Sequence, residues 1–140
     1  MNTIAKPVSQ HEALIYAMVT LSAVDRKMTD RELAKIGDVV RDLPMFRDFD
    51  PEKLVPTAEA CGAILQEKDG LDRVLGMIAA LPTRLHETAY ALAIEVAAAD
   101  LHVEQEELRF LQILRDRLEL DNLTVAAIER SARARYRTLS

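Results

Sequence analysis

The chain has 140 residues, with 23 acidic and 18 basic side chains, a formal net charge of −5 and one cysteine. The negative charge argues against nonspecific nucleic-acid binding, which depends on clustered cations. A single cysteine excludes an intramolecular disulfide and a thiolate-rich metal site. Hydrophobic residues make up 49% of the chain, with four glycines and five prolines. This composition favours long helices in a single domain spanning residues 1–140.

The first helix is predicted from its start signal. Residues 1–8 lack hydrophobic periodicity, so we expect a loose arm. Ser9 is followed three positions later by Glu12, which is the spacing of a capping box. The apolar pattern that follows predicts a helix running to about Asp25.

The second and third helices carry similar signals. Thr29 and Glu32 repeat the capping-box spacing, and Pro44 ends the second helix. Asp50-Pro51 has the form of a cap followed by proline in the first turn. Because Pro56 follows closely, the third helix starts either at Pro51 with a kink or at Pro56 itself.

The second half predicts four more helices. A turn at Asp69-Gly70 starts the fourth, and Pro82 ends it. Thr83 is predicted to cap the alanine-rich fifth helix, the sixth follows an acidic turn, and the seventh opens at Asp121 or Asn122. No segment alternates with a period of two residues. We therefore expect an all-α fold of about seven helices.

One sequence device occurs twice. Asp100 lies 75 residues after Asp25, and the same offset relates Glu107 to Glu32. In both copies an apolar helix ends in aspartate, a short turn follows, and a new helix opens with acids. This pattern predicts a duplicated helical hairpin, so that the fold holds two pseudo-symmetric halves.

The duplicated turns are the candidate metal site. The candidate ligands are Asp25, Glu32, Asp100, Glu104 and Glu107. An aspartate at a helix C-terminus is disfavoured by roughly 0.3–1 kcal/mol unless something offsets its charge. Carboxylates together with free carbonyl oxygens suit Ca²⁺ or Mg²⁺. The alternative stays open that the aspartates accept bonds from the next helix and that the glutamates complement its dipole.

A calcium EF-hand is disfavoured at both turns. Counting from Asp100, Gln105 and Leu111 occupy the sixth and twelfth positions, where that loop needs Gly and Glu. Counting from Asp25, Asp30 and Ile36 occupy them.

The segments 25–33 and 98–108 resemble the paired signature of the TerB family, bacterial proteins associated with tellurite and stress resistance. The resemblance implies an all-helical fold and acidic positions suspected of holding divalent metal, which here are Asp25, Glu32, Asp100 and Glu107. It also implies protein partners, some of them membrane-associated. The family's usual Gly after the Asp is replaced here by other residues.

The sequence leaves three hypotheses for the function of the chain. The first is a non-enzymatic TerB-like module that binds a divalent cation, and the second is a metal-free protein–protein scaffold. The third is an enzyme built on Glu95 and the histidines, although no complete catalytic constellation occurs. Glu95 is expected at the core boundary, paired with an arginine, and Cys61 is expected to pack in the core.

Cytoplasmic residence is expected, because no segment has the pattern of a signal peptide. The longest mostly apolar stretch, residues 89–99, is too short to span a bilayer. Direct membrane insertion is therefore not expected. A dimer remains compatible with the sequence.

Overall fold

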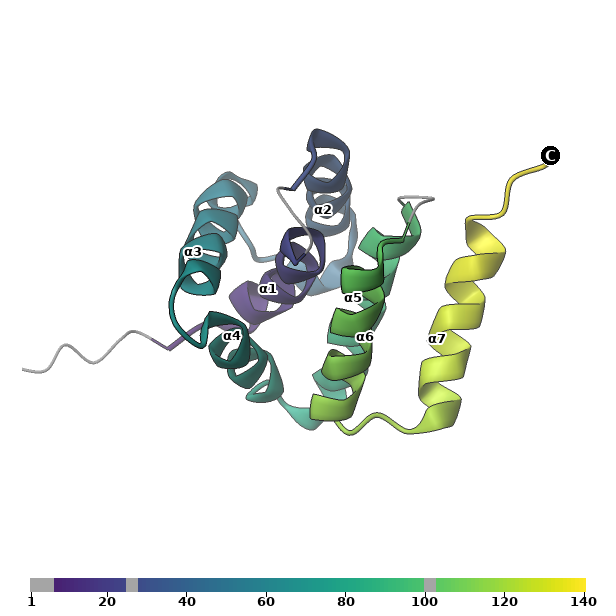
Figure 1. The fold of residues 1–140 in the computed structure, drawn as a ribbon. Helices are drawn as coiled ribbons and strands as arrows, with labels where there is room; N and C mark the ends of the chain where they lie inside the picture. Colours follow the sequence, from purple (N-terminus) through teal and green to yellow (C-terminus); the bar gives the residue numbers. More distant parts are fainter. Residues whose placement is uncertain (1–6, 25–27, 100–102) are drawn as a thin grey trace, which may run out of the picture.

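The computed structural model describes residues 7–24, 28–99 and 103–140. In these ranges the chain forms seven α-helices and no strand, so the predicted fold class is confirmed (Figure 1). The helices are α1 (Gln10–Ala23), α2 (Asp30–Asp42), α3 (Leu54–Gln66), α4 (Gly70–Ala79), α5 (His86–Ala99), α6 (Gln105–Arg117) and α7 (Asn122–Arg135). Three single 3₁₀ turns are η1 (Pro44–Phe46), η2 (Pro51–Lys53) and η3 (Thr83–Leu85).

The predicted capping box of α1 is present. The Ser9 hydroxyl accepts from the Glu12 amide at 3.1 Å, and the Glu12 carboxylate accepts from the Ser9 amide at 2.9 Å. These bonds satisfy amides that have no partner within the first helical turn. At α7, the Asp121 carboxylate accepts from the Thr124 amide at 2.8 Å, which confirms that start as well.

The structure decides between the two predicted starts of the third helix, Pro51 and Pro56, in favour of the earlier one. The 3₁₀ turn η2 comes first, α3 begins at Leu54, and Pro56 falls in its first turn, where the missing N–H costs no helical bond. The expected cap at Thr83 was wrong. Thr83 is instead the first residue of η3, with Pro82 at the N-cap position, and α5 begins only at His86.

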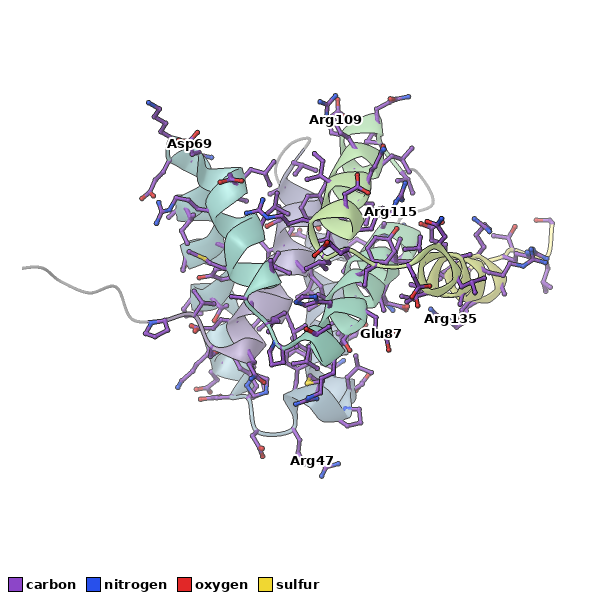
Figure 2. All side chains as sticks on the ribbon, turned by 90° about the horizontal axis from the view of Figure 1, so that it is seen from below. Arg47, Asp69, Glu87, Arg109, Arg115 and Arg135 are labelled. Atoms are coloured by element: carbon purple, nitrogen blue, oxygen red, sulfur yellow. The ribbon has the colours of Figure 1, made fainter. Side chains whose placement is uncertain are left out.

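The core is centred on α1 and α5, which pack against each other. Every residue of α1 from Ala13 to Ser22 is buried. Small residues line much of both helices, and Ala17 on α1 and Ala93 on α5 are fully buried. Small side chains allow helices to approach closely. Charged side chains such as Arg47 and Arg109 project from the outside of the molecule (Figure 2).

The outer helices surround this central pair. Helix α3 packs on α1, while α7 packs on α5. Helix α2 contacts α5, and α6 contacts α1. Helix α4 lies against α1 and α3 and also reaches α5 and α6. Of the residues in α7, Ala132 alone is buried, so α7 buries the fewest residues of the seven helices.

The helix contacts follow the 75-residue offset. Adding 75 to the residue numbers carries α1 and α2 onto α5 and α6 to within one residue, but it carries the start of α3 onto residue 129, in the second half of α7. The α1–α3 contact still has a counterpart in the α5–α7 contact. The α2–α5 contact likewise has a counterpart in the α6–α1 contact. The offset therefore matches the first two helices of each half closely and the third only in part.

Candidate functional site: two acidic turns and a charged groove

Glu32 and Glu107 occupy the same place in the two halves. Each is the third residue of its helix, and the residues are only 7% and 2% exposed. The Glu32 Oε1 atom accepts from the Thr29 amide at 2.9 Å and from its hydroxyl at 3.0 Å. The Glu107 Oε1 atom accepts from the amide of Glu104 at 3.0 Å. Both carboxylates are thus fixed at a helix start with little access to water.

The remaining candidate ligands are placed only in part. Glu104 is the exposed N-cap residue of α6, next to Glu107 in the same turn. Asp25 and Asp100 lie outside the described residues. In the ranges 7–24, 28–99 and 103–140, no three His, Cys, Asp or Glu side chains gather closely enough to hold a metal ion. The described part of each turn therefore supplies the glutamates but not a whole ligand set.

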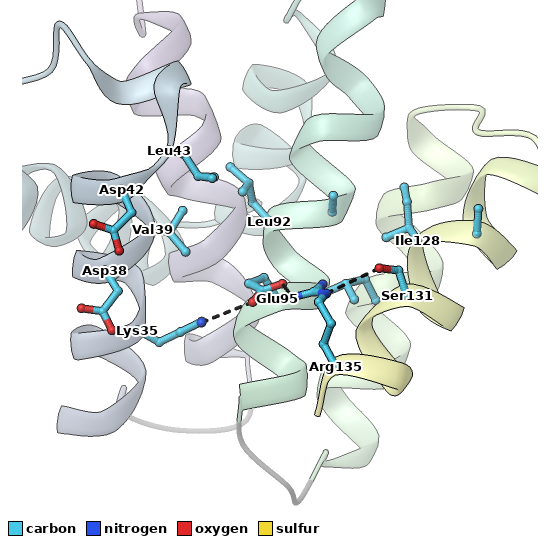
Figure 3. Close-up of a pocket in the computed structure, with 13 residues that line it drawn as sticks. Lys35, Asp38, Val39, Asp42, Leu43, Leu92, Glu95, Ile128, Ser131 and Arg135 are labelled. Atoms are coloured by element: carbon cyan, nitrogen blue, oxygen red, sulfur yellow. Dashed lines mark hydrogen bonds and ion pairs between the residues drawn. The ribbon is translucent and has the colours of Figure 1, made fainter. Parts of the chain in front are cut away.

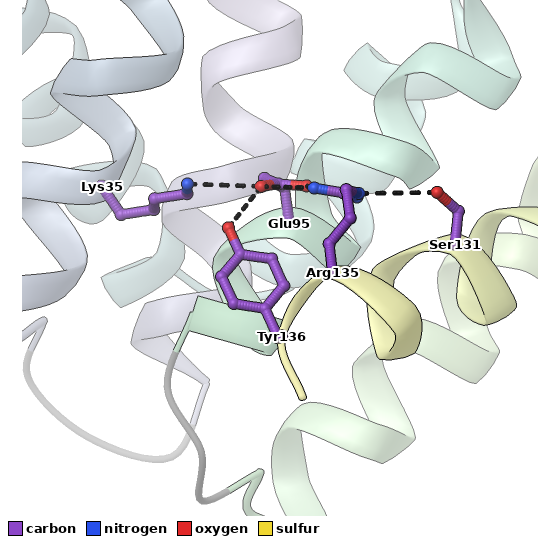
Figure 4. A network of polar contacts seen from close by, with 5 residues as sticks. All are labelled: Lys35, Glu95, Ser131, Arg135 and Tyr136. Atoms are coloured by element: carbon purple, nitrogen blue, oxygen red, sulfur yellow. Dashed lines mark hydrogen bonds and ion pairs between the residues drawn. The ribbon is translucent and has the colours of Figure 1, made fainter. Parts of the chain in front are cut away.

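A second polar site is the Glu95 cluster, formed by Lys35, Glu95, Arg135 and Tyr136 (Figure 4). The Lys35 Nζ atom lies 3.2 Å from one Glu95 carboxylate oxygen, and the Arg135 Nη1 atom lies 2.8 Å from the other. The Tyr136 hydroxyl donates to the same carboxylate. The cluster joins α2, α5 and the end of α7, and it confirms the predicted arginine partner of Glu95.

The cluster keeps Glu95 ionised. Burial by itself would raise the pKa of Glu95, but hydrogen bonds from Tyr136, Arg135 and Lys35 outweigh burial and lower that pKa below its ordinary value. Burial opposes the charge on Lys35 in the same way, yet its bonds to Tyr136 and Glu95 raise the pKa of Lys35. The carboxylate and the ammonium are therefore held as an ion pair.

An open groove of about 550 Å³ lies beside this cluster, between α2, α5 and α7 (Figure 3). Its lining includes apolar side chains from all three helices, among them Val39, Leu92 and Ile128. Asp38 and Asp42 stand along its α2 edge. We call it the α2/α5/α7 groove.

A second hollow of about 410 Å³ lies on the other side of α7, between α5, α6 and α7. Leu108 lines it and is 53% exposed. Charged side chains, Glu129 and Arg115, also line this hollow. The Tyr90 hydroxyl donates to the Glu129 carboxylate at 2.6 Å, and the Arg115 Nη1 atom lies 3.5 Å from the same carboxylate. Burial, with the contact to Glu129, raises the pKa of Tyr90 to about 12.

The histidines of α1 and α5 and the single cysteine serve the packing. The His11 Nε2 atom lies 2.8 Å from the carbonyl oxygen of Met45, and the His86 Nε2 atom lies 2.8 Å from that of Leu81. Each imidazole thus ties a helix start to a neighbouring turn. Cys61 is fully buried, and burial raises its pKa to about 11, as suits a core side chain.

No family model matches the chain, and no curated protein or solved structure matches it either. The resemblance to the TerB family therefore stays a prediction carried by the two acidic turns. Among the described residues, no helix has both the length and the apolar character needed to cross a bilayer.

Proposed function

We propose that this chain is a non-enzymatic, TerB-like module that binds a divalent cation, Ca²⁺ or Mg²⁺, through its two acidic turns. In this proposal the chain acts in tellurite or stress resistance by binding a protein partner, and membrane-associated proteins are among the candidate partners. The observation that supports it is the matched burial of Glu32 and Glu107 at the starts of α2 and α6.

The chemistry of the turns suits a hard cation. A capping-box glutamate works equally well at the surface, so capping does not require its burial. The capping bonds hold both carboxylates in fixed positions, next in sequence to the turns that carry Asp25 and Asp100. Carboxylate oxygens fixed in advance are suitable ligands for Ca²⁺ or Mg²⁺.

Calorimetric titration with Ca²⁺, Mg²⁺ and Mn²⁺ tests the proposal. We expect heat of binding and a raised melting temperature, because a cation at one hundred times its Kd stabilises the fold by about 2.7 kcal/mol. The matched variants are Glu32→Gln and Glu107→Gln, which keep the capping bond and remove the charge. Each should weaken binding. No heat and no shift in melting temperature with any of the three ions would exclude cation binding.

The second candidate is a metal-free scaffold for protein–protein interaction. It is favoured by the two open hollows on either side of α7, which leave apolar side chains of α2, α5 and α6 accessible. Such hollows suit a protein partner or a second copy of the chain.

An enzyme built on Glu95 is less well supported. A general base or acid working near neutral pH needs a carboxyl whose pKa is raised. The pKa of Glu95 is lowered, and three donors already occupy its carboxylate. We therefore propose a structural role for Glu95, as the group that ties α7 to α5 and α2.

A further inference from the structure

The hollow between α5, α6 and α7, called here the α5/α6/α7 hollow, has a mostly apolar lining. Buried side chains of α5 and α6, among them Ile94 and Leu111, form part of it. Val103 and Leu108 also line it and stay 40% and 53% exposed. Its volume of about 410 Å³ lies within the range of roughly 300–1,000 Å³ that is usual for small-molecule sites. The hollow therefore offers apolar surface that a small apolar group would cover.

The charged side chains in this lining leave one positive charge uncompensated. Glu129 accepts from the Tyr90 hydroxyl and lies 3.5 Å from Arg115, so the charges of Glu129 and Arg115 offset each other. Arg133 of α7 lines the same hollow and is exposed. It makes no ion pair or hydrogen bond with any residue in the ranges that the structure describes. An anionic group bound in the hollow would find this guanidinium available.

Two further arginines near Arg133 strengthen the positive charge along α7. Arg130 lies three residues before Arg133, which makes the two neighbours on the helix surface, and Arg137 follows just past the end of the helix. Both are exposed, and neither is paired with a described residue. Residues 122–140 hold four arginines and one glutamate, in a chain whose net charge is −5. Like charges at this spacing repel each other, and a bound anion relieves that repulsion.

A comparable hollow between α1 and α3 lacks this charge. Met28 lines it, and Val103, which stands 75 positions later, lines the α5/α6/α7 hollow. At the same offset, Ala58 lines the first hollow where Arg133 lines the second. Among the described residues, no charged side chain lines the α1/α3 hollow. A small apolar side chain thus serves at the corresponding place, and the arginine gives the α5/α6/α7 hollow a chemistry that the other hollow does not have.

We infer that the α5/α6/α7 hollow binds a small, free amphiphile with an anionic head, such as an alkyl carboxylate. The apolar body covers Val103 and Leu108, and the head pairs with Arg133. Apolar lining with one placed charged group is the usual composition of a small-molecule site, because the lining supplies affinity and the charge sets orientation. A guanidinium suits a carboxylate, which it can bind through two parallel hydrogen bonds. This ligand goes beyond the proposed cation function and uses neither acidic turn.

The probe is decanoate, titrated below its micelle concentration into the ¹⁵N-labelled full chain with a chelator present. We expect saturable amide shifts at the residues of α5, α6 and α7 that line the hollow. Decyltrimethylammonium, which has a tail of the same length and the opposite charge, should bind at least fivefold more weakly. Acetate, which has the head alone, should give no saturable shift. Equal binding of the two long-chain probes, or decanoate shifts confined to the α1/α3 hollow or the α2/α5/α7 groove, would overturn the inference.

Two pairs of variants separate the head contact from the tail contact. Arg133→Gln should weaken decanoate binding about five- to tenfold, whereas Arg84→Gln, at an exposed arginine of η3 outside the hollow, should leave it unchanged. Leu108→Asp should weaken it at least tenfold, whereas Leu123→Asp, at a leucine that is 83% exposed and outside the hollow, should not. All four positions are exposed, so the fold should survive each change. Binding by Arg133→Gln or Leu108→Asp within twofold of wild type would contradict the inference.

A last comparison distinguishes a free amphiphile from a lipid surface. The chain is sedimented with phosphatidylglycerol vesicles under the same conditions. Decanoate binding without cosedimentation supports the inference, whereas cosedimentation without any shift from decanoate would overturn it in favour of a membrane surface. Because the chelator removes divalent cations, decanoate binding supports the hollow even if the calorimetric test of the acidic turns fails.

Discussion

Replacing Glu95 by Gln tests how α7 is held. The substitution keeps the size of the side chain but removes the charge that pairs with Lys35 and Arg135. A hydrogen bond to a charged group contributes about 1.5–3 kcal/mol, and an exposed ion pair contributes less than about 1 kcal/mol. Arg135 is half exposed and Lys35 is a quarter exposed. We therefore expect the free energy of opening α7 to fall by about 1–2 kcal/mol.

Hydrogen–deuterium exchange measures this change helix by helix. Helix α7 buries only Ala132, so its amides should be less protected than those of α1 in the wild type. In Glu95→Gln the protection of α7 should fall about five- to thirty-fold, as 1–2 kcal/mol requires. The matched control is Glu59→Gln, at an exposed position on α3, which should change nothing.

The pH dependence follows from the lowered pKa of Glu95. Because its folded-state pKa lies below the unfolded value, its contribution is full above the unfolded pKa of about 4.3 and is lost as pH falls through the folded value. The difference between wild type and Glu95→Gln should therefore be constant near neutral pH and shrink in acid. The reasoning would be refuted if the wild-type amides of α7 were as protected from exchange as those of α1. It would also be refuted if the protection of α7 in Glu95→Gln stayed within twofold of the wild-type protection.

The remaining predictions concern the core and the caps. Cys61 should react with a thiol reagent at pH 8 only as fast as the protein opens, since its thiol is buried with a pKa near 11; rapid reaction of the native protein would contradict this. Ala93→Leu should lower the free energy of unfolding in urea by about 1–3 kcal/mol through overpacking of the core, whereas Ala126→Leu at an exposed position on α7 should have little effect. Glu32→Ala should cost about 1 kcal/mol more than Glu32→Gln, because only Gln can accept from the Thr29 amide; equal melting temperatures would argue against the capping bond.

Local signals in the sequence predicted most of the fold. Capping boxes at Ser9 and Thr29 and the cap at Asp121 depend on residues three apart, so they are visible in one dimension. The prediction for Thr83 was wrong because a threonine before a helix also suits the first position of a 3₁₀ turn, which it occupies here. The start of α3 stayed open in the sequence, because Asp50-Pro51 and Pro56 both have the form of a helix start.

The partial match between α3 and the second half of α7 was not visible in the sequence. The contact between Thr20 and Cys61 and the contact between Glu95 and Tyr136 occupy equivalent places, but the residues have no chemistry in common. The sequence predicted an arginine partner for Glu95 but did not identify which arginine, because that contact depends on how the helices pack. Lys35 lies 60 residues from it in sequence and reaches it only because α2 packs on α5.

Crystals grown with Mn²⁺, as an anomalous stand-in for Ca²⁺ or Mg²⁺, test the central claim most directly. The account predicts two anomalous peaks, one beside Glu32 at the start of α2 and one beside Glu107 at the start of α6. The two ions should be bound by residues that correspond at the 75-residue offset between Glu32 and Glu107. Capping bonds at both glutamates with no ion at either turn, or an ion bound only by groups elsewhere, would contradict the account.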